Sequence, residues 1–564
     1  MDAVSKTVEL FVPLSDVVLP GDSAPDVRLR TPTPAAAGDV AEHLRPVRTD
    51  RSDWEQALSQ LAIERARSLQ GIPRSTPLRG RLRRRALDAR KGFAVGYRVE
   101  VELWPDTEAM PSGLPRLPAP RLAPKGRRVI VVGSGPAGTF AALRLAQAGV
   151  AVLVLEQGKP VQPRRHDLAS ITRGTLVADS NYCFGEGGAG TYSDGKLYTR
   201  SKDRQAVSEV LATLVDHGAD PIIGVDSRPH IGSNRLPQIL VGMRQHLVSL
   251  GVEYGFSERV QDLLIDDRGQ VIGVRCASGR EEVGDAVVLA VGHSAREIYA
   301  LCQRRGVALV AKPFAIGVRV EHPQPLIDRL QYGRAWEHPA LPAAFYQLAA
   351  QASGRGVYSF CMCPGGWVVP ASTESGGLCT NGMSLKRRDS PLANAALVVS
   401  VEPADVRAGS SGTDDVLSGI AFQRAVEERA FAAGGGGYLA PAQRLVDFLA
   451  GRRSDTLLRS TYRPGIVPGD LAALLPSFVV DALRQGIRLF DKTAPGFISP
   501  QAQLVGVETR TSSPLRILRD DSFMSPSHPG LFPIGEGAGY AGGIVSAAMD
   551  GLRAADAALS RLGA

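Results

Sequence analysis

The glycines at positions 133, 135 and 138 have the spacing of a dinucleotide-binding turn. In this turn (GSGPAG), the first glycine permits a tight bend, the second lets a pyrophosphate touch the backbone, and the third lets a helix approach a strand. The helix that follows presents free N–H groups and a positive dipole end to phosphates. The competing interpretation is a glycine-rich turn without a ligand. The candidate cofactor contacts in this segment are Gly133, Gly135, Pro136, Ala137 and Gly138.

An acidic residue, Glu156, lies 18 positions after Gly138. A carboxylate at this point can accept hydrogen bonds from both hydroxyls of an adenosine ribose, and its charge repels a 2′-phosphate. The residue therefore predicts FAD or NAD as the bound dinucleotide and argues against NADP. Gln157 beside it is a further candidate contact.

The surrounding elements supply the context that this motif requires. An apolar strand at 128–132, a helix at 137–148 and a strand at 151–155 form a β-α-β unit. We expect a second buried strand at 286–291 and a strand at 530–535, followed by a helix from about 544. No second β-α-β unit built on a GxGxxG turn is predicted, so no dedicated NAD(P)H-binding Rossmann domain is predicted.

Two later segments favour FAD over NAD. Residues 285–292 resemble the ATG-type strand of glutathione-reductase-type flavoproteins, which passes beside the cofactor. Residues 535–539 (GEGAG) resemble the GD motif of the same proteins, with Glu536 in place of aspartate, and the resemblance points the next helix at the flavin N1/O2 edge. The candidate contacts here are Ala290, Gly292, Gly535, Glu536, Gly542, Gly543 and Ile544.

A glycine-rich loop at 184–196 is the next candidate. Five glycines in thirteen residues suggest backbone folded against a flat ligand, and the loop at this point lines the isoalloxazine in related flavoproteins. An ordinary surface loop is the alternative. Lys196 and Tyr198 follow and are candidates for facing the flavin. The candidate cofactor contacts in the loop are Gly185, Gly187, Gly188 and Gly190.

Three further side chains are candidates for catalysis. Cys361 and Cys363 could form a redox pair, but redox dithiols favour CxxC spacing, so buried packing residues are the preferred interpretation. No metal site is predicted, because neither a CxxC motif nor paired histidines accompany them. Arg510 could bind a substrate carboxylate or the flavin edge, or it could form a structural ion pair. The nine histidines receive no role.

Motifs along nearly the whole chain resemble the family of bacterial and plastid FAD-dependent dehydrogenases, the NAD(P)/FAD-dependent oxidoreductases. The resemblance implies an FAD-linked oxidoreductase with an N-terminal appendage, and it does not imply a substrate. The matching stretches are 85–91, 184–197, 312–319, 358–366, 380–384, 506–514 and 535–550.

The predicted fold class is α/β. We expect a glutathione-reductase-type FAD-binding Rossmann-like domain, an inserted mixed α+β substrate domain and a small N-terminal α/β module. The 564 residues, 44% of them hydrophobic, are enough for about three domains. The predicted divisions are the N-terminal module at 1–104, a proline-rich linker at 105–127, the FAD-binding domain at 128–312, the substrate domain at 313–505 and the C-terminal return of the FAD-binding domain at 506–564.

The N-terminal module carries the strongest basic run, at 79–85 (RGRLRRR). A nucleic-acid or membrane patch is one interpretation, and a solvated strand edge is the preferred one. Within the module we expect strands at 8–14 and 93–103 and a helix at 54–69. Six cysteines do not make a disulfide framework, and neither a secretory signal nor a long apolar run is visible, so we expect a cytoplasmic protein.

The leading functional hypothesis is hydride transfer between flavin N5 and a small organic substrate bound between the FAD domain and residues 313–505. NAD(P)H as a transient co-substrate and O₂ as an acceptor stay open as electron partners. A flavoprotein that acts on nucleic acid through its basic N-terminal module is the alternative. A third hypothesis is an electron-transfer subunit with an exposed apolar patch in place of a closed pocket.

Overall fold

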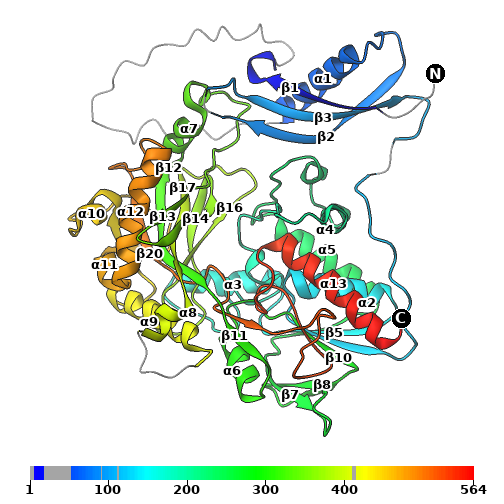
Figure 1. The fold of residues 1–564 in the computed structure, drawn as a ribbon, viewed down its shortest axis with the longest axis vertical. Helices are drawn as coiled ribbons and strands as arrows, with labels where there is room; N and C mark the ends of the chain where they lie inside the picture. The colour runs from blue at the N-terminus through cyan, green and yellow to red at the C-terminus, as the bar shows by residue number, and fades with distance from the viewer. Residues whose placement is uncertain (1–5, 18–51, 91, 111–112, 409–414) are drawn as a thin grey trace.

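The computed structural model describes residues 6–17, 52–90, 92–110, 113–408 and 415–564. Residue 91, the last of the 85–91 match, and the first five residues lie outside this range. Three α/β units follow one another along the chain, and the second is completed by the C-terminal segment (Figure 1). The predicted α/β fold with an FAD-binding Rossmann-like domain is confirmed.

The central unit contains a five-stranded parallel sheet in the order β22-β10-β4-β5-β6. Residues 129 and 131 of β4 are buried toward one face and residues 130 and 132 toward the other, as the continuous apolar run predicts. The strands are β4 Arg128–Val132, β5 Ala151–Glu156, β6 Glu253–Phe256, β10 Ala286–Leu289 and β22 Leu531–Pro533.

Two helices lie side by side on one face of this sheet, α2 (Pro136–Gln147) and α13 (Ile544–Leu562) (Figure 1). They approach closely because Gly551 has no side chain, and a Cβ there would lie 2.1 Å from the Ala137 carbonyl oxygen. The other elements of this unit are α3 Val161–Ile171, α4 Arg204–Asp216, α5 Leu236–Ser249, β7 Val260–Ile265, β8 Val271–Cys276, β9 Glu281–Val283 and α6 Arg296–Arg304.

The third unit along the chain is built on a seven-stranded sheet in the order β13-β14-β17-β12-β20-β18-β19. Its pairs are antiparallel except β18 with β19. The strands are β12 Phe314–Pro323, β13 Ala349–Ala352, β14 Arg355–Cys363, β17 Leu392–Val401, β18 Ala440–Arg444, β19 Ile466–Pro468 and β20 Gln503–Glu508.

Helix α12 (Ser477–Thr493) covers one face of this sheet and leaves the other toward the FAD-type unit (Figure 1). Strand β20 runs to Glu508 within the sheet, so we propose that the junction with the C-terminal return lies after this strand. The remaining elements are β11 Leu309–Ala311, α7 Gln324–Tyr332, β15 Gly366–Pro370, β16 Thr380–Ser384, α8 Pro403–Ala408, α9 Ser418–Ala433, α10 Leu445–Ala450, α11 Leu471–Leu474 and β21 Leu515–Ile517.

The N-terminal module is a three-stranded antiparallel sheet with one helix, α1 (Ser52–Leu69). Its strands β1 (Lys6–Pro13), β2 (Leu78–Asp88) and β3 (Gly96–Pro105) have the order β1-β3-β2, so the basic run lies on an edge strand as predicted. The prediction that a strand starts at Phe93 is wrong. That ring is exposed and contacts the Arg90 guanidinium, and the strand begins three residues later.

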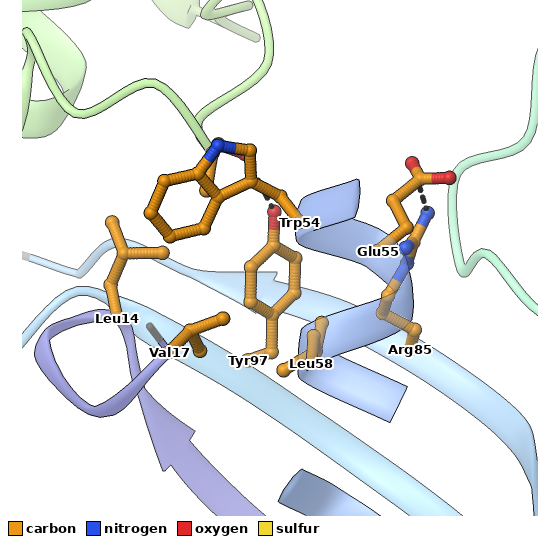
Figure 2. Close-up of a pocket in the computed structure, with 8 residues that line it drawn as sticks. Leu14, Val17, Trp54, Glu55, Leu58, Arg85 and Tyr97 are labelled. Carbon is orange, nitrogen blue, oxygen red and sulfur yellow. Dashed lines mark hydrogen bonds and ion pairs between the residues drawn. The ribbon is translucent and has the colours of Figure 1, made fainter. Parts of the chain in front are cut away.

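This module contacts both other units through a small pocket. Figure 2 shows Trp54 above Tyr97, whose hydroxyl donates a hydrogen bond to the Ala340 carbonyl oxygen at 3.4 Å. The buried Arg85 guanidinium pairs with Glu55 of α1 at 3.2 Å and with Asp226 of the central unit at 2.7 Å.

Among the helices that the structure describes, none is both long and apolar enough to cross a bilayer.

Candidate functional site

The carboxyl ends of four neighbouring parallel strands carry the glycines and carboxylates singled out in the sequence. Strand β4 leads into Gly133, β5 ends at Glu156, β10 leads into Gly292 and β22 into Gly535. This edge is where open parallel sheets bind their ligands, because the strand ends and helix N-termini face one crevice.

Two glycines of the first turn have the steric roles that their spacing predicts, and the third faces open space. Gly133 has φ +103°, and a Cβ there would lie 2.4 Å from the Ala290 carbonyl oxygen. A Cβ on Gly138 would lie 1.9 Å from the Gly133 carbonyl oxygen, so only glycine lets α2 pack against the turn. A Cβ on Gly135 would meet nothing within 4 Å. The structure therefore leaves open space at the one glycine where a pyrophosphate is expected.

Two other predicted contacts face open space in the same way. Added Cβ atoms on Gly292 and Gly543 also meet nothing within 4 Å. Gly543 is the N-cap of α13, and no side chain caps this helix end or the N-terminus of α2, so both leave free amide donors. Glycines from three elements thus surround a cradle with two positive helix ends, which fits an anionic dinucleotide.

The Glu156 carboxylate is buried and joins the first turn to the glycine-rich loop. One oxygen accepts hydrogen bonds from the Ser134 amide (2.9 Å) and hydroxyl (2.8 Å), and the other accepts from the amides of Gly158 and Gly185 (both 2.9 Å). Four donors fill the acceptor sites of a carboxylate. The ribose contact stays a prediction, and it requires the rotatable Ser134 hydroxyl to give way.

A small pocket beside Glu156 has both apolar and polar walls. Leu155, Phe184, Val260 and Ile298 line it, which suits the faces of a flat ring such as adenine. Gln157 lines the same pocket, and its side-chain amide donates to Asp179 at 2.9 Å.

The loop at 185–190 is packed over the first turn. The Gly187 amide donates to the Ser134 carbonyl oxygen at 3.0 Å, and a Cβ on Gly188 would lie 3.4 Å from the Gly135 Cα. Gly190 faces Pro136 and Ile544, so the loop touches the start of both helices. The buried Arg164 guanidinium fixes the loop by donating to the carbonyl oxygens of residues 181, 186 and 188.

The GEGAG turn is held against the end of β10. The Gly535 amide donates to Asp550 at 2.7 Å, and this carboxylate also pairs with Arg519. A Cβ on Gly537 would lie 2.5 Å from the Gly292 carbonyl oxygen. Glu536 Oε1 lies 3.6 Å from His293 Nδ1, so its side chain stays at this strand edge.

The structure brings three of the five catalytic candidates together. Lys196 Nζ lies 3.8 Å from the sulfur of Cys361 and 3.9 Å from that of Cys363. Arg319 of β12 also lies beside the pair, with Nη2 3.8 Å from the Cys363 sulfur, and it forms an ion pair with Glu508 of β20. The FAD-type unit contributes the lysine and the seven-stranded sheet contributes the other four residues.

Buried charges shift the pKa values in this cluster. Burial raises the pKa of Glu508 to about 7, although the Arg319 guanidinium offsets part of that effect. Lys196 also lies 3.5 Å from Asp194, whose carboxylate pairs with Arg388. Burial raises the pKa of Asp194, but the Arg388 guanidinium and the Lys196 ammonium outweigh burial and lower the pKa to about 2.

The comparisons with known proteins agree with this geometry. Residues 128–166 match the model of an FAD binding domain, and residues 313–511 match a family described as FAD-dependent protein, C-terminal domain-like. A protein of Clostridium beijerinckii is 45% identical over 434 residues, which cover 76% of this chain and 80% of the relative. The chain belongs to the FAD-dependent oxidoreductase family. Its cofactor is FAD.

Similar solved structures have low sequence identity to this FAD-dependent oxidoreductase. Glycine oxidase from Geobacillus kaustophilus is 13% identical, with 77% of this chain and 95% of that chain covered and a TM-score of 0.34. Quinol fumarate reductase from E. coli is 14% identical, with 78% and 70% covered and a TM-score of 0.34.

The other two catalytic candidates of the oxidoreductase lie outside the cluster. The Tyr198 ring is exposed, with the Arg228 guanidinium 5.9 Å from its centroid. The buried Arg510 donates through Nε (3.0 Å) and Nη2 (2.7 Å) to the Glu427 carboxylate, and through Nη1 to the Thr373 hydroxyl. All three nitrogens of this guanidinium have protein partners, which favours the structural ion pair over a substrate contact.

Sequence reasoning did not assign roles to Arg164, Arg319, Glu508 or Asp550. A signal for two of them exists, because Arg319 and Glu508 are charged residues within otherwise apolar strand segments. Such residues are buried with a partner more often than they are exposed inside a sheet. Their pairing could not be read from the sequence, since 189 positions separate them.

Proposed function

We propose that this FAD-dependent oxidoreductase transfers a hydride between flavin N5 and a small organic substrate bound where the FAD-type unit faces the seven-stranded sheet. When bound, FAD supplies the two-electron chemistry. The observation that carries the proposal is the cluster at this junction, where Lys196 of one unit meets Cys361 and Cys363 of the other.

The chain's own residues have three tasks in this account. The N-terminal amides of α2 and α13 hold the anionic parts of the cofactor, because both helix ends are uncapped. The docked loop at 185–190 excludes water from the turn beneath it. Lys196 supplies a fixed positive charge, and Glu508, with a pKa of about 7, holds or releases a proton near neutrality.

An aromatic wall beside the cluster supports a substrate with an apolar part. Phe360 pairs across the sheet with Ala396, and Ala396 with Arg319, so Phe360 and Arg319 lie on the same face. Tyr358, two residues earlier, shares that face, and both rings are exposed. We infer that these rings contact the substrate.

Anaerobic stopped-flow spectroscopy tests the electron partners. Oxidised holoenzyme is mixed with NADH or NADPH, and the flavin absorbance is followed. Bleaching by either nucleotide at a rate that saturates with concentration supports a transient nicotinamide donor. Failure of both removes the nicotinamide-linked version, and a screen of organic donors by the same bleaching then tests hydride transfer from the substrate.

The nucleic-acid alternative receives less support from the basic edge strand. Arg81 and Arg83 both pair with Glu102, and Arg85 pairs with Asp226, so part of the run's charge is neutralised within the chain. A gel shift with tRNA and duplex DNA at physiological salt separates the two functions. Binding that disappears with added salt and ignores sequence is a charge effect only.

A further inference from the structure

Cys361 and Cys363 occupy an irregular part of β14 that brings their sulfurs together. On a regular strand, residues two apart share a face, but their Cα atoms are about 6.7 Å apart, near the upper limit of about 6.8 Å for a disulfide. Here the register with β17 shifts between Phe360 and Cys363, and Cys361 has φ +43°. This bulge bends the chain, and both sulfurs lie within 4 Å of one Lys196 nitrogen.

We propose that Cys361 and Cys363 form a reversible dithiol–disulfide pair that exchanges two electrons with the bound flavin. The inference rests on the proposed function in one respect, the position of the flavin ring at this junction. It adds a second redox site to the chain. It also differs from the packing interpretation, which the sequence favoured because redox dithiols prefer CxxC spacing.

The electrostatics favour the thiolate at Cys361 and the thiol at Cys363. The hydrogen bond from Cys363, together with the Lys196 and Arg319 cations, places the pKa of the Cys361 thiol well below its usual value, although burial opposes this. The same hydrogen bond and burial raise the pKa of Cys363. The Cys363 thiol also approaches the Cys361 carbonyl oxygen at 3.3 Å. A thiolate beside a thiol is the reduced state from which a disulfide forms.

The step balances without another reactant. The Cys361 thiolate and the Cys363 thiol lose two electrons and one proton as the S–S bond forms. Oxidised flavin accepts those two electrons and that proton, and becomes the anionic reduced form. In the reverse direction the S–S bond breaks and the same proton returns to Cys363.

The segment that carries Lys196 also contacts the elements of the expected cofactor site. Lys196 follows the loop that packs over Gly135, and three residues later the Thr199 hydroxyl lies 2.9 Å from the Ser546 hydroxyl in the first turn of α13. The lysine that contacts both sulfurs therefore belongs to the segment lying between the two helix ends of the cofactor cradle.

The first experiment measures the thiols without any organic substrate. Holoenzyme and flavin-stripped protein are equilibrated in glutathione redox buffers, the free thiols are trapped with iodoacetamide, and peptides are mapped by mass spectrometry. We expect a Cys361–Cys363 disulfide that forms and disappears reversibly in both samples. Cys379→Ser is the matched control, because Cys379 is buried and burial raises its pKa to about 11. Both thiols remaining alkylatable at every buffer ratio would overturn the proposal.

A second variant tests the role of the lysine. Lys196→Met should slow iodoacetamide modification of Cys361 at pH 7 about tenfold or more, because the thiolate loses its nearest cation. The trapping rate is measured in flavin-stripped protein with circular dichroism as the check on folding. An unchanged rate in folded protein would contradict the arrangement.

The third experiment tests the coupling to flavin. In an anaerobic dithionite titration, disulfide-form wild type should accept twice as many electrons per flavin as Cys361→Ser or Cys363→Ser, because each couple takes two. Equal uptake by wild type and variants would show that the thiols do not communicate with the flavin. None of these three experiments uses an organic substrate. A failure of the hydride-transfer proposal in stopped-flow spectroscopy can therefore be distinguished from a failure of the dithiol proposal.

Discussion

At the scale of single residues, buried carboxylates that pair with cations hold the elements around the site together. Glu427 of α9 accepts from Arg510 and from Arg296 of α6 (2.8 and 3.0 Å for Arg296), so one carboxylate ties the unit of the seven-stranded sheet to the FAD-type unit. Burial raises its pKa, but the two guanidinium groups outweigh burial and lower the pKa to about 2. The ionised form is therefore part of the folded structure.

Glu427→Gln tests this claim. At pH 7 the variant should lose about 3–5 kcal/mol of unfolding free energy, because it leaves the buried Arg510 guanidinium without its anion and removes one of the two carboxylates that pair with Arg296. The folded pKa lies below the unfolded value of about 4.3, so the carboxylate stabilises above that value and its contribution fades as pH falls toward 2. Urea unfolding should thus show a smaller difference between variant and wild type at pH 3 than at pH 7. An equal loss at both pH values would contradict the ion-pair account.

At the scale of elements, two nearby glycines of the first β-α-β unit have different roles, one in packing and one in the expected cofactor contact. Gly138 is required by the contact between α2 and the preceding turn, whereas Gly135 faces open space. Both glycines were predicted from spacing, because this motif is local and each position has its own steric reason. The Glu427 network joins residues 131 and 83 positions apart, and local patterns carry no information on such contacts.

Gly135→Ala and Gly138→Ala form a matched pair. In Gly138→Ala the new Cβ would lie 1.9 Å from a carbonyl oxygen, so α2 must shift, and we expect a loss of about 1–3 kcal/mol in flavin-free protein. Gly135→Ala should leave that stability unchanged and weaken FAD binding at least about tenfold, equal to about 1.4 kcal/mol. Flavin fluorescence titration and thermal unfolding measure the two effects. Normal FAD affinity in a folded Gly135→Ala protein would refute the pyrophosphate position.

At the scale of the whole molecule, buried Arg85 joins the N-terminal module to the central unit through Asp226, and apolar residues of the module share one buried cluster with the seven-stranded unit. The sequence predicted the module and its edge strand from composition and alternation. It did not predict that one arginine of the basic run is buried against Asp226, because this partner lies 141 positions away.

Arg85→Ala should loosen this docking. Losing the charged hydrogen bonds should cost about 1–3 kcal/mol of module association, and proteolysis in the proline-rich linker at 105–127 should become faster. Arg84→Ala is the control, because Arg84 is exposed on the same strand. Limited proteolysis followed by mass spectrometry gives the comparison. Equal cleavage rates in the two variants would mean that the module does not depend on Arg85.

The most direct test of the account is a crystal structure of the FAD-loaded protein. We expect the pyrophosphate oxygens within hydrogen-bonding distance of the α2 amides at Ala137 and Gly138, and the flavin ring facing Lys196 and Cys361. A flavin ring placed away from that lysine, or a pyrophosphate bound anywhere other than the start of α2, would contradict it.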